Sequence, residues 1–367
     1  MKMKLRIIIV SIFVCGTLFL CISCAQDRAE DGGNKPKNVI LMIGDGMGLA
    51  QMHAAMVVNN NTLNIERCKV VGLTRTQAID DFITDSGASG TAIATGCKTV
   101  NGAIAVTPQG EELKTILEYA EDAGLSTGLV STSSITHATP ATFIAHQMSR
   151  KEYEHIALDF LNTDIEIFVG GGLDHFTKRK DGRDLVVELK EKGYFVATSL
   201  DELRNSEGHK VAGLLADVHL PKASEGRGNM LEVSVEKSLE ILSADPDGFF
   251  LMVEGSQIDW GGHDKDRDYI ISEALDFDRA VGSALDFADR NGETLVIVTA
   301  DHETGGMAIR NGDPEKGIVD VDFTSDDHTG IMVPVFAYGP GSLEFGGIYE
   351  NTGLFFRMMD ALGLGGE

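Results

Sequence analysis

Positive charge is scarce in this chain of 367 residues. Lysine and arginine together number 31, against 56 aspartates and glutamates, so the formal net charge is −25. Proteins that bind nucleic acid neutralise backbone phosphates with a surplus of lysine and arginine. The acidic balance therefore argues against a nucleic acid partner. An anionic ligand could still be held locally, by a metal ion or by a well-placed arginine.

Cysteine is scarce as well, with five in the whole chain. Three of them lie within or directly after the N-terminal apolar run, which leaves Cys68 and Cys97 for the rest of the protein. In an oxidising compartment these two could form a disulfide, but a lone pair without a wider framework is weak support for one. Two buried, reduced thiols are the alternative.

The chain opens with a targeting segment. Three basic residues precede the apolar run "IIIVSIFVCGTLFLCIS", which is too short and too early for a comfortable membrane-spanning helix. Ser23 before Cys24 resembles the cleavage box of bacterial lipoproteins, although Cys21 stands where leucine is usual. We predict a lipoprotein signal over residues 1–23, a lipid anchor on Cys24, and export to the periplasm or outer membrane. Ordinary signal cleavage and an uncleaved anchor are the alternatives.

The remainder alternates apolar strand patterns with amphipathic helix patterns. Residues 24–37 are polar, contain glycine and proline, and are predicted to be a tether to one catalytic domain over 38–367. Strands are expected at 38–43, 127–132, 165–171, 249–255, 293–300 and 333–339, and helices at 112–124, 183–193, 230–242 and 271–292. Apolar strands alternating with helices predict an α/β/α sandwich around a large, mostly parallel sheet.

Acidic residues and histidines follow three of these strands. In open α/β sheets, ligands bind beyond the carboxyl ends of the strands. One aspartate there would be unremarkable, whereas three strands that each deliver a carboxylate are hard to explain as solvated loops. The residues concerned are Asp45, Glu254, Asp259, His263, Asp301 and His302.

Together with His328, this set has the chemistry of a metal centre. Mixed histidine and carboxylate ligands suit Zn²⁺, and carboxylate with hydroxyl oxygen suits Mg²⁺. The set is too large for one ion, so two or three ions are implied. Each residue alone also has a simpler interpretation: Asp45 between glycines could serve a turn, and Asp259 with His263 could be a surface pair on a helix.

A nucleophile is suggested by the small-residue stretch "ITDSGASGTAIATGCKT". Metal coordination can lower the pKa of a serine hydroxyl, which makes Ser86 a candidate. The surrounding glycines and alanines would let a helix N-terminus approach an anion closely, or would simply let a helix pack tightly. Arg150 could bind phosphate through two nitrogens, although a lone arginine is more often a surface charge.

In six segments, the sequence resembles the alkaline phosphatases. The resemblance is carried, in order, by "NVILMIGDGMG", "TDSGASGTAIATGCKT", "THATPATFIAHQMSR", "VEGSQIDWGGHD", "TADHETGG" and "DDHTG". These segments spread over about residues 38–330. A single such pattern could arise by chance, but six in the family's order are a specific match.

The resemblance implies a role for each candidate. Ser86 would be the nucleophile that becomes phosphoserine, Arg150 would hold two phosphate oxygens, and Asp85 would orient Arg150. Two zinc ions and one magnesium ion are implied, and the substrates would be small phosphate monoesters. The ligands would be Asp45, Asp301 and His302, with Ser86, for one zinc; Asp259, His263 and His328 for the other; and Asp45, Glu254, Thr139 and His137 for magnesium.

Two positions depart from the pattern of many relatives. His137 stands where many bacterial members have aspartate, which weakens the preference for magnesium and could admit zinc at the third site. Trp260 stands where many members have lysine or histidine that contacts phosphate through water, so we expect weaker phosphate binding.

Other functions stay open at this stage. A phosphodiesterase or sulfatase of the same superfamily, and a phosphate- or metal-binding lipoprotein without catalysis, are the alternatives. The resemblance also leaves a homodimer open.

Overall fold

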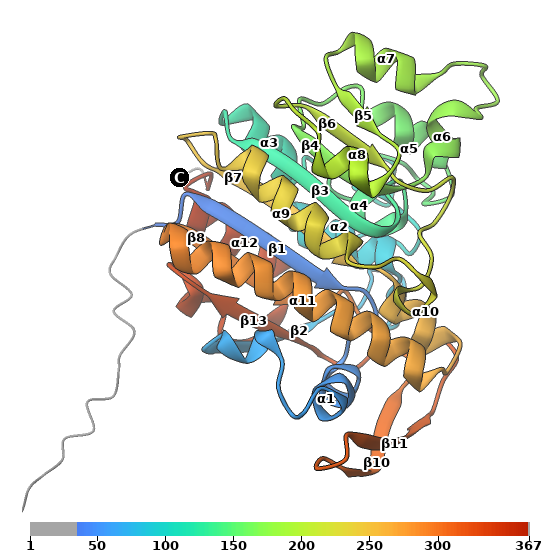
Figure 1. Ribbon diagram of the computed structural model, residues 1–367, viewed down its shortest axis with the longest axis vertical. Coiled ribbons are helices and arrows are strands. Elements are labelled where there is room, and N and C mark those ends of the chain that lie inside the picture. The colour runs from blue at the N-terminus through green and yellow to red at the C-terminus, as the bar shows by residue number, and fades with distance from the viewer. Residues whose placement is uncertain (1–34, 366–367) are drawn as a thin grey trace, which may run out of the picture. The chain divides into compact units, whose positions relative to one another are not determined.

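The computed structural model describes residues 35–365, so the predicted signal, Cys24 and most of the tether lie outside the described part. Within it, ten strands form one sheet, and every neighbouring pair is parallel except the two pairs made by β13 (Figure 1). The predicted large, mostly parallel sheet is therefore confirmed. From one edge to the other the strands are β14 (Gly347–Glu350), β2 (Val70–Arg75), β13 (Val333–Tyr338), β8 (Thr294–Thr299), β1 (Asn38–Gly44), β7 (Phe249–Gly255), β3 (Ser126–Ser134), β4 (Ile167–Gly171), β6 (Val211–Leu214) and β5 (Phe195–Ala197).

Helices cover both faces of this sheet, because its central strands carry apolar side chains on both. In β1, Ile40 and Met42 point into one core, whereas Val39, Leu41 and Ile43 point into the other. The first core is covered by α1 (Leu49–Val58), α8 (Leu200–Arg204), α9 (Met230–Leu242), α10 (Gln257–His263) and α11 (Arg267–Asn291). The second is covered by α2 (Ser86–Thr95), α3 (Ile116–Asp122), α4 (Ala138–Ala141), α5 (Tyr153–Asp159), α6 (Leu173–Thr177), α7 (Leu185–Glu191) and α12 (Thr352–Leu362). This is the predicted α/β/α sandwich.

All six predicted strands and all four predicted helices are present. The structure adds β2, β5, β6 and β14, which lie at or near the two edges of the sheet. Strand β5 has only three residues, and β2 alternates buried and exposed positions, so neither presents a continuous apolar run. Short or half-exposed edge strands carry the weakest sequence signal, and this is why they were missed.

Short elements complete the fold. A hairpin is formed by β10 (Met307–Asp313) and β11 (Ile318–Phe323), and β9 (Glu303–Thr304) pairs with β12 (His328–Thr329). Three 3₁₀ turns are η1 (Asn64–Arg67), η2 (Ala223–Glu225) and η3 (Ser342–Phe345). Among residues 35–365, no helix has both the length and the apolar character needed to cross a bilayer.

The two cysteines of the described part are both free. Cys68 is buried and Cys97 is exposed, so neither the disulfide nor a pair of buried thiols is correct. Burial raises the pKa of the Cys68 thiol to about 12, which makes it unreactive at neutral pH.

Candidate active site and metal centre

The predicted acidic residues meet at the carboxyl edge of the three central strands. Strand β1 lies between β7 and β8, and Ile43 of β1 is level with both Glu254 and Thr299. Asp45 follows β1 directly, and Asp301 and His302 follow β8 in a loop, as predicted. The register therefore brings side chains from three distant parts of the sequence together, and all of these polar groups are fully buried.

Ser86 lies at the first position of α2, where Asp85 caps the helix. The Asp85 Oδ1 accepts the backbone N–H of Ala88 at 2.9 Å, which satisfies one free donor of the first turn. The Ser86 side chain is buried, and its Oγ lies 3.3 Å from His302 Nε2. The helix start thus presents one hydroxyl to the acidic edge of the sheet.

The helix that carries Ser86 is held from the far end of the chain. Ser89, one turn later, donates its hydroxyl to the Asp301 carbonyl at 2.6 Å. Asn351, directly before α12, donates to the Ser89 Oγ at 3.0 Å. Gly96, which ends α2, has space for no side chain, because a Cβ there would lie 2.6 Å from the Phe355 ring of α12. The small-residue stretch is therefore both a candidate nucleophile turn and a packing face.

An inner group of ligand atoms surrounds His302. Its Nε2 lies 3.4 Å from Asp45 Oδ1 and 3.3 Å from Asp301 Oδ2. Its Nδ1 lies 3.2 Å from the hydroxyl of Thr304, which donates a short hydrogen bond to Asp259 and so accepts from the ring. A neutral His302 would then carry its proton on Nδ1 and leave Nε2 free for a metal ion or the Ser86 hydroxyl.

An outer group is built by Asp259, His263 and His328. Asp259 Oδ1 lies 3.4 Å from His263 Nε2 and 3.5 Å from His328 Nε2. Asp259 and His263 are one turn apart on α10, and the pairing of β12 with β9 places His328 opposite Thr304. The Nδ1 atoms of both histidines face backbone carbonyls at 2.8 Å, so both Nε2 atoms are directed toward Asp259.

A third group lies beside Glu254. Its Oε2 accepts hydrogen bonds from Ser131 and Ser256, each at 2.7 Å. Among the described residues, Glu254 Oε1, Thr139 Oγ1 and His137 Nδ1 have no hydrogen-bond partner. These are the three predicted ligands of the third ion apart from Asp45.

Crowding of buried carboxyl groups shifts their pKa values upward. Burial and the charges of Asp301 and Asp259 raise the pKa of Asp45 well above its ordinary value. Burial raises the pKa of Glu254 to about 7, and burial with the charge of Asp259 raises that of Asp301 to about 6. Without cations, these acids therefore resist ionisation at the pH at which free carboxyl groups are fully charged.

The outer group behaves differently, because its carboxylate has partners. Burial alone would raise the pKa of Asp259, but the hydrogen bond from His328 and the nearby histidines hold it well below its ordinary value. Burial opposes the charged form of His328, yet the hydrogen bond with Asp259 raises its pKa to about 9. Burial and His328 lower the pKa of His302, so that ring is neutral.

Arg150 and Asp85 form a partly buried ion pair. The Arg150 Nη1 donates to Asp85 Oδ2 at 2.8 Å, with 22% of the arginine side chain exposed. Burial works against both charges, but their mutual attraction lowers the pKa of Asp85 and raises that of Arg150. Arg150 is therefore not a free surface charge, and its orientation is set by the residue that precedes Ser86.

The residues present fit the metal ions that the resemblance implies. Within the described part, six of the twelve buried side-chain atoms without a hydrogen-bond partner belong to this cluster: Asp45 Oδ1 and Oδ2, His137 Nδ1, Thr139 Oγ1, Glu254 Oε1 and Asp301 Oδ2. Ligand atoms of Asp45, Asp301 and His302 lie within 4.8 Å of one another. The same holds for ligand atoms of Asp259, His302 and His328. Buried acceptors without partners are costly unless a cation satisfies them.

Some neighbours of the site were missed by the sequence analysis. Thr304 links His302 to Asp259, and Asp327 has a carboxylate oxygen within 4.8 Å of ligand atoms of both His263 and His328. Both lie inside the quoted segments "TADHETGG" and "DDHTG", which is the only local signal for them.

Trp260 lies beside the third group, where its ring contacts two histidines. Its ring centroid is 6.0 Å from that of His137 and 4.9 Å from that of His219, edge-on in both cases. His219 was not singled out in the sequence, because no pattern links it to the other segments.

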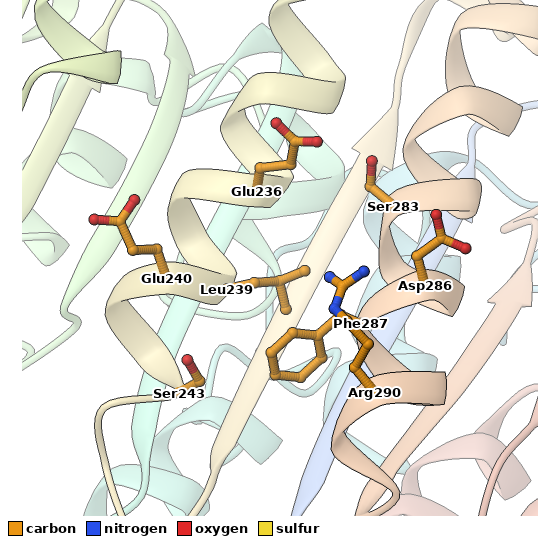
Figure 2. Close-up of a pocket in the computed structure, with 8 residues that line it drawn as sticks. All are labelled: Glu236, Leu239, Glu240, Ser243, Ser283, Asp286, Phe287 and Arg290. Atoms are coloured by element: carbon orange, nitrogen blue, oxygen red, sulfur yellow. The ribbon is translucent and has the colours of Figure 1, made fainter.

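A groove between α9 and α11 lies away from these residues (Figure 2). It has a volume of about 330 Å³ and is lined by Glu236, Leu239, Glu240, Ser243, Ser283, Asp286, Phe287 and Arg290. No predicted site residue lines this groove, so it has no part in the site described above.

Comparison with known proteins agrees with the resemblance. The family model for alkaline phosphatase matches residues 36–320. Alkaline phosphatase 4 of Bacillus subtilis (strain 168) is 37% identical over 89% of this chain and 88% of its own length. Alkaline phosphatase of Escherichia coli (strain K12) is 32% identical over 90% of this chain and 87% of its own length.

Solved structures agree as well. Alkaline phosphatase from the Antarctic bacterium TAB5 superposes with a TM-score of 0.86 at 41% identity, over 90% of this chain and 99% of that one. A variant of that enzyme with a histidine replaced by aspartate has magnesium bound in its M3 site. The chain therefore belongs to the alkaline phosphatase family and is a phosphomonoester hydrolase.

Proposed function

We propose that the protein hydrolyses small phosphate monoesters through a phosphoserine on Ser86. The observation that carries the proposal is the position of the Ser86 hydroxyl. It lies at a helix N-terminus, 3.3 Å from a neutral His302, beside buried carboxylates that lack partners. A hydroxyl placed so is ready to lose its proton and attack phosphorus. The ester oxygen would leave as an alcohol, and water would then release inorganic phosphate.

Two features of the chain would bind the phosphate group. Ser86 lies at the N-terminus of α2, and helix N-termini favour anions. Arg150 uses Nη1 to bond Asp85, which leaves the other nitrogens of its planar group for two phosphate oxygens. Since Arg150 would occupy the space that a second ester group needs, the arrangement favours monoesters over diesters.

Divalent cations would complete the site. We assign one zinc ion to Asp45, Asp301 and His302 with Ser86, a second to Asp259, His263 and His328, and a third ion to Asp45, Glu254, Thr139 and His137. When bound, such ions lower the pKa of a hydroxyl and stabilise negative charge on the attacking and leaving oxygens. The TAB5 variant in which aspartate replaces a histidine has magnesium bound in its M3 site. This supports the proposal that a histidine or an aspartate at the third site influences which ion binds there. With His137 in this chain, that site would accept zinc as well as magnesium.

The decisive experiment removes the Ser86 hydroxyl. Ser86→Ala should lower kcat by about a thousandfold or more, because the nucleophile itself is lost, while bound zinc measured by elemental analysis stays near the wild-type amount. Thr95→Val, which removes another buried hydroxyl from the same helix, is the matched control and should keep most of the activity, because that hydroxyl bonds backbone groups at the far end of the helix. Full activity in Ser86→Ala would overturn the proposal.

Two further measurements separate the alternatives. Phosphate trapped covalently on Ser86 at low pH would exclude a protein that merely binds phosphate. A higher kcat/KM for an aryl phosphate than for the corresponding bis-aryl phosphate would exclude a diesterase.

Trp260 gives the proposal a quantitative test. Because its side chain has no positive charge, Trp260→Lys should strengthen inhibition by inorganic phosphate, with the inhibition constant falling several-fold. An unchanged inhibition constant would remove Trp260 from the phosphate site.

The N-terminal segment supports a proposal on location. Export as a lipoprotein anchored at Cys24 would place the enzyme in the periplasm or at the outer membrane. Cys24→Ala should then move the activity from the membrane fraction to the soluble fraction of a bacterial host. The homodimer stays a prediction, which light scattering on the mature chain would test.

A further inference from the structure

Three aromatic rings form a closed cluster at the border of the active site. The centroids of His137 and His219 are 5.6 Å apart, those of His137 and Trp260 6.0 Å, and those of His219 and Trp260 4.9 Å. The three pairs have interplanar angles of 89°, 87° and 73°, which is the edge-to-face geometry that aromatic rings prefer. His137 and Trp260 are candidates for metal and substrate binding, whereas His219 has no assigned role.

The connection between β6 and α9, which carries His219, is fixed against the end of β4. The backbone N–H groups of Gly172 and Leu173 both donate to the Ala216 carbonyl at 3.0 Å. The contact is so close that a Cβ on Gly171 would lie 2.2 Å from the Val218 carbonyl oxygen. This part of the connection therefore has little freedom to move, even though it lies at the surface.

The His219 ring itself is oriented by a hydrogen bond. The backbone N–H of Ser134 donates to His219 Nδ1 at 3.1 Å, and the Ser134 hydroxyl donates to the Val218 carbonyl at 2.7 Å. At the next residue, the Leu220 carbonyl accepts from Gln257, which lies on α10 with Trp260. The connection is thus attached on one side to β3 and on the other to the helix that carries Trp260.

Burial shows which ring depends on the other. Trp260 is half-buried and His219 is exposed, so the imidazole is part of the cover of the indole and is itself open to water. Removing that imidazole would leave Trp260 with a free side and with additional rotamers. The same change would withdraw one edge contact from His137.

We propose that His219 is a positioning residue that holds the Trp260 and His137 rings in the orientation needed to bind the phosphate monoester. The part that concerns the substrate rests on the proposed function, whereas the effect on Trp260 does not. In the variant, the loosened Trp260 side chain would have to be ordered when the substrate binds. The conformational entropy lost in ordering one side chain corresponds to roughly a two- to tenfold weaker affinity. KM should therefore rise by that factor while kcat changes less than about twofold.

The chain offers a direct spectroscopic reading, because Trp260 is its only tryptophan. In His219→Ala, the emission of Trp260 should move to longer wavelength, and its quenching by acrylamide should increase. His219→Phe keeps a ring beside Trp260 and should restore both emission and KM. His219→Asn keeps a hydrogen-bond acceptor for Ser134 but has no ring, and should resemble the alanine variant. His209→Ala, at an exposed position just before β6, is the control and should match the wild type.

Each outcome decides the proposal. An unchanged emission spectrum in His219→Ala overturns the positioning of Trp260, whether or not the protein proves to be a phosphatase. A shifted spectrum with unchanged KM for p-nitrophenyl phosphate overturns the role in substrate binding. Rescue by asparagine and not by phenylalanine would show that the hydrogen bond, not the ring, is what matters, and would also overturn the proposal.

Discussion

Two groups of buried acidic residues in this protein differ in whether their carboxylates have cationic partners. On α11, Glu273 and Asp276 are buried against Arg227, which donates hydrogen bonds to both, and the three side chains are only 1% exposed. At the carboxyl edge of the sheet, Asp45 and Asp301 are equally buried but have no cationic side chain bonded to them, and several of their oxygens have no partner.

The difference separates an acid cluster that supports the fold from one prepared for a ligand. Buried charges are tolerated when they are paired and fully hydrogen-bonded, as around Arg227. In the unpaired cluster, burial first and neighbouring carboxylates second raise the pKa values of Glu254 and Asp301, and a bound cation would oppose both effects. Changes to the two clusters should therefore affect stability with opposite signs.

The largest expected effect is the loss of the arginine in the paired cluster. Arg227→Met should lower the free energy of unfolding by about 3–5 kcal/mol, because buried Glu273 loses its counter-charge and buried Asp276 keeps only the partly exposed Arg279. Urea denaturation of the chelator-treated protein would measure it. Arg310→Met is the matched control: its side chain is 56% exposed and pairs with Asp320 and Asp322, so less than about 1 kcal/mol should be lost. Equal losses in both variants would contradict the comparison.

A gain in stability is expected from the unpaired cluster. Asp45→Asn should raise the free energy of unfolding of the metal-free protein at pH 8 by about 1–2 kcal/mol, because one of several mutually repelling buried charges is removed. With zinc at about a hundred times its dissociation constant, the wild type should gain about 2.7 kcal/mol, and the variant much less. A metal-free variant less stable than the wild type would show that this cluster does not repel itself.

A partly buried pair on the other side of the sheet should give the smallest effect. Burial lowers the pKa of His146, but hydrogen bonds to Glu118 and to the Ala105 carbonyl outweigh it and raise the pKa to about 9. Because the folded protein holds this proton more tightly than the unfolded chain, the pair stabilises the fold below pH 6.5. That contribution should be lost as the pH rises from 6.5 to 9.

The measurement compares His146→Gln with the wild type across this range. The wild type should be more stable by about 1 kcal/mol at pH 6, with the difference fading by pH 9. His155→Gln removes an exposed pair with Glu152 and should leave the pH dependence unchanged. A difference that grows with pH would mean that the sign of the shift is wrong.

The sequence predicted the architecture of the site well wherever the signal was local. The ends of three apolar strands located Asp45, Glu254 and Asp301, since parallel strands bring their carboxyl ends to one edge. The run of small residues suggested a helix start near Ser86, whereas the capping role of Asp85 was not predicted. Choosing Ser86 over Ser89 required the family resemblance, because periodicity cannot distinguish two hydroxyls on one buried helix.

The remaining contacts have no local signal. Thr304 meets Asp259, and Arg227 meets Glu273, across 45 and 46 residues of chain, and nothing in the intervening sequence fixes those distances. His219 reaches Trp260 only because the connection after β6 lies against β4, a placement set by backbone hydrogen bonds that any residue can make. Edge strands such as β5 escaped notice for the related reason that short, half-exposed segments have no distinctive pattern.

The chain of contacts from Asn351 through Ser89 to Asp301 has a consequence for the order in which the enzyme matures. The helix with the nucleophile packs against α12, which follows every proposed metal ligand in the sequence, and Asn351 directly precedes α12. A nascent chain that already contains every proposed metal ligand would still lack the support that holds Ser86 in place. Catalytic competence therefore requires that α12 has been made and packed against α2, and is not reached when the last proposed metal ligand has been synthesised.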